Sequence, residues 1–234
     1  MGTTTVWGEI DGREITFPME VPAFDATTMG FAVPAAEAAS LLPGSAFEIV
    51  EIGPGVAQLV LAVCDYRDNP WGDYNEVNLG FLARPTGGPA DVVGSFVYRM
   101  PVDQAFTCEA GNRVMGFPKT VEEIDVETGA DEVVIRLRSE GVEALSVVLP
   151  RVAAAGPAPR IEAESYSYLD GVPHVTPLAM DMGTGVVDPA SVRVAVGAGP
   201  IADELRRLGL PRQPDFCTWG EGLSATFQLG RPLP

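Results

Sequence analysis

Short runs of apolar residues recur along the chain at the length of β-strands. Residues 56–63 (VAQLVLAV) are almost entirely apolar, as expected for a strand that is covered on both faces. Residues 92–100 and 142–149 form two further runs of this kind. In residues 132–138, Val133, Ile135 and Leu137 alternate with mostly charged neighbours, and the turn-forming residues 127–131 precede them. This pattern predicts an antiparallel hairpin.

Two segments carry the pattern of short helices. Residues 34–42 open with a proline in the first turn and stop before Pro43-Gly44. Residues 201–208 have acidic residues early, basic residues late and a glycine directly after them. A third, short helix is expected around residues 102–109. The sequence therefore predicts a mainly β (α+β) fold, mostly antiparallel, with a few helices at its edge.

The composition is that of an ordinary globular protein, with 46% hydrophobic and 20% charged residues among 234. The 26 glycines and 21 prolines favour many turns between short elements. The best internal linker is residues 153–159 (AAAGPAP). Because the predicted strands on its two sides are alike, we expect a single domain over residues 1–234 with one long connection.

Charge and cysteine usage narrow the classes of partner. A net charge of −17 argues against binding to nucleic acid or to an anionic membrane surface. Cys64, Cys108 and Cys217 are odd in number, far apart and outside any C-x-x-C spacing, which is typical of reduced, structural thiols. The first ten residues show no pattern of a signal peptide, and Val6 departs from the myristoylation pattern. We therefore expect a cytoplasmic protein.

Several kinds of catalytic site are excluded because His174 is the only histidine. Metal sites built from several histidines need more, and a Ser-His-Asp or Cys-His arrangement would have to use this one. No G-x-S-x-G motif is present. We interpret His174, within GVPHVTP, as a residue of a loop or rim. Neither a metal nor another cofactor is expected.

Lys119 is the only lysine among 15 basic residues, and it follows the apolar stretch 115–118 (MGFP). Arginine replaces lysine at most surface positions but does not give up its proton, so a retained lysine suggests a role for a neutral amine. A neutral amine attacks ketones to form an imine. The alternative is a lysine at the start of a strand whose stem covers apolar surface while its amine stays in water.

Glu76 lies in the segment 71–79 (WGDYNEVNL), where Tyr74, Glu76 and Asn78 share one face of the predicted strand. A carboxylate that faces inward beside an amine could move protons during imine formation. The alternative, which is commoner for an isolated glutamate, is a solvent-facing strand edge.

Taken together, these segments resemble the acetoacetate decarboxylase superfamily. The resemblance is carried by Gly72-Asp73-Tyr74-Asn75-Glu76 and by Gly116-Phe117-Pro118-Lys119, in this order and some forty residues apart. Three later segments, 159–161, 199–205 and 219–223, also fit, so that the resemblance spans roughly residues 15 to 230.

The resemblance implies a cone-like, mostly antiparallel β-barrel with a few peripheral helices, an active site inside the barrel and a homo-oligomer. It implies that Lys119 forms a Schiff base with a small keto acid, that Glu76 assists it, and that no cofactor takes part. Two cations of the family are missing: Thr120 stands where the decarboxylase has a second lysine, and Phe24 stands near the position of an arginine beside the substrate.

Side chains that could line the substrate site are chosen by type and by closeness to the two motifs. Arg113 is a possible replacement for the missing cations. The other candidates are Phe24, Met29, Tyr74, Met115 and Phe117.

Three functions remain open. The first is a decarboxylase of acetoacetate or a related β-keto acid. The second is an aldolase-dehydratase type of lyase that condenses pyruvate with an aldehyde through the same lysine. The third is a barrel that binds a small ligand without catalysis, in which Lys119 has lost its role.

Overall fold

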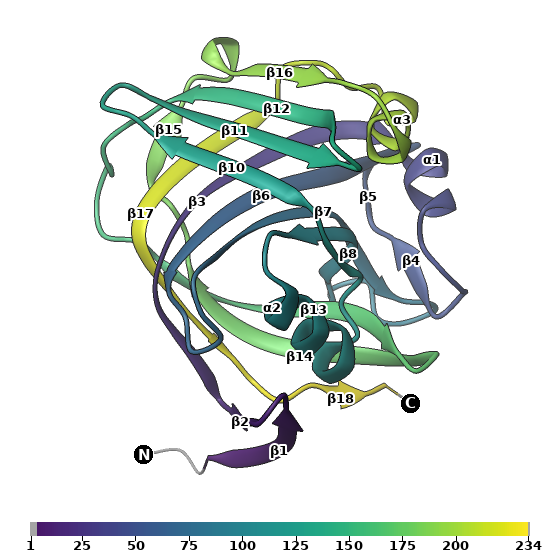
Figure 1. The fold of residues 1–234 in the computed structure, drawn as a ribbon. Helices are drawn as coiled ribbons and strands as arrows, with labels where there is room; N and C mark the ends of the chain where they lie inside the picture. Colours follow the sequence, from purple (N-terminus) through teal and green to yellow (C-terminus); the bar gives the residue numbers. More distant parts are fainter. Residues whose placement is uncertain (1–3, 234) are drawn as a thin grey trace.

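A closed ring of strands forms the main body of the computed structural model, which describes residues 4–233 (Figure 1). Within these residues the ring has seven strands, and the order around it is β17, β3, β6, β7, β8, β13, β14 and back to β17. Their bounds are β3 Met19–Pro34, β6 Val56–Asp68, β7 Tyr74–Pro85, β8 Gly94–Val102, β13 Arg160–Leu169, β14 Val172–Asp181 and β17 Phe216–Phe227. Neighbours in the ring are antiparallel except β8 and β13, which pair in parallel over two residues. The prediction of a mostly antiparallel β-barrel with a few helices is confirmed.

A second, antiparallel sheet covers one side of the ring (Figure 1). It consists of β10 (Glu123–Thr128), β11 (Glu132–Ser139), β12 (Val142–Pro150) and β16 (Arg193–Val196). β10 and β11 are the hairpin predicted from the alternation of Val133, Ile135 and Leu137, all of which are fully buried.

The remaining elements are short. β1 (Thr5–Ile10) and β2 (Arg13–Phe17) form a separate hairpin. The strands along the edges of the main sheet are β4 (Phe47–Ile49), β5 (Glu51–Gly53), β9 (Lys119–Val121), β15 (Gly185–Val187) and β18 (Arg231–Pro232). The helices are α1 (Ala35–Ser40), α2 (Ala105–Ala110) and α3 (Pro200–Arg207), the π-helical turn η1 (Gly111–Met115) and the 3₁₀ turn η2 (Pro189–Ser191). None of the helices in residues 4–233 has the length and hydropathy needed to cross a membrane.

Two apolar clusters lie on opposite faces of β3, β6 and β7. One face contributes residues such as Met29, Leu61 and Leu79 to a core shared with the β10–β12 sheet. The other face contributes Phe24 and Tyr74 to a cluster with α2, η1 and the β1–β2 hairpin. Because successive residues of a strand point to opposite faces, one set of strands serves both clusters. The second cluster surrounds the candidate site.

Most predicted elements are present, with one correction. α1, α3 and α2 correspond to the three expected helices, and residues 151–159 form an irregular connection between β12 and β13. His174, expected in a loop or at a rim, instead lies in β14 and is only 7% exposed. Gly171 and Pro173, which precede His174, are typical of turns, but β14 already begins at Val172. Residues 1–3 and 234 lie outside the described residues. The first three belong to the segment in which no signal-peptide pattern was found.

Candidate active site

Lys119 reaches the interior because the chain turns sharply before it. η1 is followed by Gly116, whose φ of +66° is a left-handed conformation that suits glycine. A Cβ at Gly116 would also run into the backbone oxygen of Tyr168. Phe117 and Pro118 then lead into β9, where Lys119 pairs with Met100 of β8. The side chain of Lys119 is only 4% exposed, so the alternative of an amine held in water is wrong.

The buried amine of Lys119 is paired with a buried carboxylate. Nζ donates a hydrogen bond to Oε2 of Glu76 at 2.6 Å and a longer one to Oγ1 of Thr107 at 3.3 Å. It also lies 5.0 Å from the ring centre of Tyr74. Glu76 is 5% exposed, so the alternative of a solvent-facing strand edge is wrong for this residue. Removing either partner would leave a buried charge without compensation.

The second oxygen of Glu76 is held by different donors. Asn78, two residues further along β7, donates from Nδ2 to Oε1 at 3.0 Å. The hydroxyl of Tyr66 on β6 donates to the same oxygen over 3.4 Å. The carboxylate is therefore fixed at one oxygen while the other faces the lysine amine, an arrangement that fits a group that accepts a proton.

Neutral groups make up the rest of the immediate surroundings. Burial, followed by the negative charge of Glu76, raises the pKa of Tyr66 and Tyr74 well above the ordinary value of a phenol. The same two causes, in the same order, raise the pKa of the Cys64 thiol. All three groups keep their protons near neutral pH, so that they add no further negative charge beside Glu76.

Aromatic and sulfur-containing side chains pack on the same face of the sheet as the Lys119–Glu76 pair. Phe24, Tyr74, Met115 and Phe117, four of the predicted lining residues, all belong to the buried cluster on this face of the sheet. The ring of Tyr66 lies 5.5 Å from that of Phe24 and stacks on that of Tyr74 at 4.5 Å. The structure therefore places these four residues in one apolar cluster, in which Tyr74 lies directly beside the amine of Lys119.

Met29 and Arg113 do not join them. Met29 is five residues from Phe24 on β3, an odd number, and its side chain belongs to the opposite core. The side chain of Arg113 is 53% exposed and pairs with Glu109 at 2.7 Å, one turn earlier on the same helical segment. The expectation that Arg113 replaces the missing cations is not supported, because its charge is neutralised at the surface.

Several residues of the site were not predicted. Cys64 and Tyr66 reach it because β6 pairs with β7 in a register that sets Cys64 opposite Glu76 and Tyr66 opposite Tyr74. Thr107 of α2 and Asn112 of η1 form hydrogen bonds with Lys119. No pattern in the sequence indicates that this helical segment packs beside the lysine. Only Asn78 carried a signal, since the alternation along its strand already placed it on the face of Glu76.

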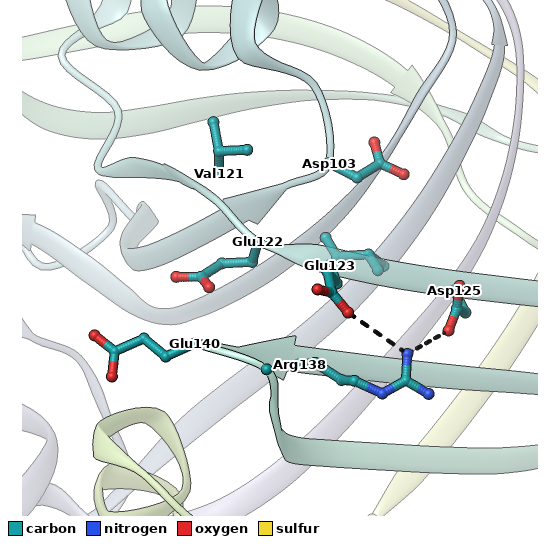
Figure 2. Close-up of a pocket in the computed structure, with 9 residues that line it drawn as sticks. Asp103, Val121, Glu122, Glu123, Asp125, Arg138 and Glu140 are labelled. Carbon is teal, nitrogen blue, oxygen red and sulfur yellow. Dashed lines mark hydrogen bonds and ion pairs between the residues drawn. The ribbon is translucent and has the colours of Figure 1, made fainter.

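A surface hollow of about 520 Å³ lies near the start of β10 and differs in character from this site (Figure 2). Its wall carries the carboxylates of Asp103, Glu122, Glu123, Asp125 and Glu140. Its one cation, Arg138, is paired with Asp125 at 2.8 Å and with Glu123 at 4.0 Å. An anionic keto acid would be repelled here, and the described residues include no His, Cys, Asp or Glu cluster suited to a metal ion.

Comparison with known proteins identifies a family by sequence. The sequence model of the acetoacetate decarboxylase (ADC) family matches residues 11–212. No curated protein matches the chain.

Solved structures share the fold at low sequence identity. An acetoacetate decarboxylase structure is 12% identical with a TM-score of 0.69, covering 92% of this chain and 89% of that chain. The acetoacetate decarboxylase from Legionella pneumophila subsp. pneumophila str. Philadelphia 1 is 14% identical with a TM-score of 0.67, covering 93% and 87%. The enduracididine biosynthesis enzyme MppR, complexed with the condensation product of pyruvate and imidazole 4-carboxaldehyde, is 15% identical with a TM-score of 0.54, covering 90% and 87%. Since the family's model spans most of the sequence, this chain belongs to the acetoacetate decarboxylase family.

Proposed function

We propose that the protein is a lyase that forms a Schiff base between Lys119 and a small β-keto acid. The observation that carries the proposal is the buried pair of Lys119 and Glu76, with 2.6 Å between Nζ and Oε2. Membership of the acetoacetate decarboxylase family supports the same class of reaction.

Imine formation uses both members of the pair. Glu76 accepts a proton from the ammonium of Lys119, and the neutral amine attacks the ketone carbon of the substrate. The carbinolamine then loses its hydroxyl as water, with a proton returned by the acid form of Glu76, and a protonated imine remains. The neutral hydroxyl groups of Tyr66 and Tyr74 add no negative charge that would oppose these steps.

The protonated imine makes loss of carbon dioxide possible. When the bond between the α-carbon and the carboxylate breaks, its electron pair moves into the iminium and gives an enamine. The α-carbon of the enamine takes up a proton, and water hydrolyses the resulting imine to release a ketone and free Lys119. Because the imine itself accepts the electrons, this chemistry needs no additional cofactor.

A second candidate reaction uses the same lysine. The imine of pyruvate loses a proton from its methyl group, and the enamine attacks the carbon of an aldehyde; water is then lost from the adduct. The likeness to MppR, whose structure holds a condensation product of pyruvate and an aldehyde, favours this candidate. So do Thr120 and Phe24, which stand where the decarboxylase has cations that suit a β-keto carboxylate.

Product analysis separates the candidates. The protein is incubated with acetoacetate while carbon dioxide is measured, and with pyruvate plus an aromatic aldehyde while the absorbance of a conjugated enone is followed. Carbon dioxide release is the result expected from the main proposal, and enone formation would select the second candidate. Lys119→Met should abolish either activity in a protein that still folds, although its melting temperature should be lower because Glu76 loses its partner. Activity retained by this variant would contradict both reactions, and no turnover of either substrate would favour the non-catalytic barrel.

A further inference from the structure

A single π-helical turn separates α2 from the lysine strand. η1 (Gly111–Met115) continues α2 directly, and the two together lie against β8, β9, β13 and β14 (Figure 1). Turns of this wider kind are rare and are frequently found at functional sites. Here the turn sets two consecutive residues, Gly111 and Asn112, beside Lys119.

The side chain of Asn112 binds both backbone groups of Lys119. Oδ1 of Asn112 accepts a hydrogen bond from the backbone N–H of Lys119 at 2.8 Å, and Nδ2 donates to the backbone oxygen of Lys119 at 3.1 Å. β9 has only three residues and pairs with β8 along one edge. Asn112 therefore serves Lys119 as a neighbouring strand would.

Gly111 gives the lysine side chain its space. A Cβ at this position would lie 2.6 Å from Cδ and 2.7 Å from Cε of Lys119, closer than such atoms approach one another. The stem of the lysine consequently passes over the bare backbone of the turn. Gly111 thus leaves room for the side chain of Lys119, and Asn112 holds the backbone of Lys119 in place.

We propose that Asn112 is a positioning residue for Lys119. By fixing the backbone at both its donor and its acceptor, Asn112 keeps Nζ directed at Oε2 of Glu76. The side chain of Asn112 is solvent-exposed and buries little apolar surface. We therefore expect its replacement to affect the placement of the amine more than the overall stability of the protein. The expected effect of Asn112 on catalysis rests on the proposed function, whereas its expected effect on the position of the Lys119 amine does not.

The single lysine makes the amine directly observable. Protein grown with lysine labelled with ¹³C at Cε gives one lysine Cε signal, because the chain has no other lysine. In Asn112→Ala we expect this signal to move toward the position of a solvent-exposed lysine. Arg113→Ala is the matched control, since Arg113 is the next residue, is exposed and pairs with Glu109. The lysine Cε signal of this variant should coincide with that of the unaltered protein.

The same variants are then compared in borohydride trapping of a keto acid. A displaced amine should form the trapped adduct about 10- to 100-fold more slowly in Asn112→Ala, with no change in Arg113→Ala. If the unaltered protein traps no carbonyl compound, the proposed function fails, and the Cε signal alone decides on Asn112. Should Asn112→Ala not fold, Asn112→Ser is measured in its place. A Cε signal that stays at its original position in the folded variant would overturn the proposal.

Discussion

Nζ of Lys119 and Oε2 of Glu76 lie 2.6 Å apart on side chains that are 4% and 6% exposed. The two residues are 43 positions apart in the sequence and come from different strands, β9 and β7. Such a pair is held in place by the surrounding structure, because neither charge is stable alone in a buried setting. It places a proton acceptor at the atom that must lose a proton before it can attack a carbonyl carbon.

Replacing Glu76 with glutamine tests the role of the carboxylate. Glu76→Gln keeps the size of the side chain and an oxygen that can accept a hydrogen bond from Lys119, but it removes the proton acceptor. The rate at which a keto acid is trapped on Lys119 should fall by about 10²- to 10⁴-fold. Time courses at equal protein concentration measure it, and a rate equal to that of the unaltered protein would show that Glu76 does not move the proton.

The two donors to Oε1 of Glu76 should differ in importance. Asn78 donates at 3.0 Å and Tyr66 over 3.4 Å, and the strength of a hydrogen bond falls with distance. Asn78→Leu should therefore reduce turnover by roughly tenfold, which corresponds to the loss of one hydrogen bond to a charged group. Tyr66→Phe, the matched comparison, should have the smaller effect on kcat. The reverse order would mean that Oε1 is oriented by the phenol.

The fold was largely predictable from the sequence. Alternation at Val133, Ile135 and Leu137 predicted the β10–β11 hairpin, since one face of it is buried. The short Lys119 motif and the Glu76 motif predicted the two ends of the ion pair by resemblance. His174 was misplaced because Gly171 and Pro173 are typical of turns, whereas the turn covers only residues 170 and 171, and β14 then pairs His174 with Ser167 of β13.

The unpredicted part of the site depends on contacts between distant elements. Cys64 and Tyr66 reach Glu76 through the register of β6 against β7, which no single strand specifies. Met29 shows the converse: it was chosen by residue type, but its position on β3 directs it to the other core. Periodicity therefore gave the faces of the strands correctly, while the partners across the sheet required the structure.

Gly111→Ala should impair the amine more than the fold. The added methyl group would meet Cδ and Cε of Lys119, and the flexible lysine stem can move away at the expense of its contact with Glu76. We expect slower trapping by about 10-fold or more with a modest change in melting temperature. The control is Gly156→Ala, because a Cβ at Gly156 has no atom within 4 Å. Equal trapping rates in the two variants would argue against a constrained path for the lysine.

Stability should depend on pH through His174. Burial, with the charge of Arg231 as the smaller cause, lowers the pKa of His174 below its ordinary value of 6.5. The unfolded chain then binds a proton at a higher pH than the folded protein, so the free energy of unfolding falls as the pH is lowered below about 6.5. Urea midpoints at about pH 7.5 and about pH 5.5 measure the change, which should be smaller in His174→Gln. An identical change in both proteins would assign the dependence to other groups.

The most direct test of the central claim is reductive trapping read out by intact mass. The protein is incubated with acetoacetate or with pyruvate in the presence of borohydride, and the adduct is located by peptide mapping. Lys119 carries the only side-chain amine, so the labelled peptide is unambiguous. The account predicts one reduced adduct on the Lys119 peptide and none in Lys119→Met. An unmodified protein with both keto acids, or an adduct confined to the N-terminal amine, would contradict it.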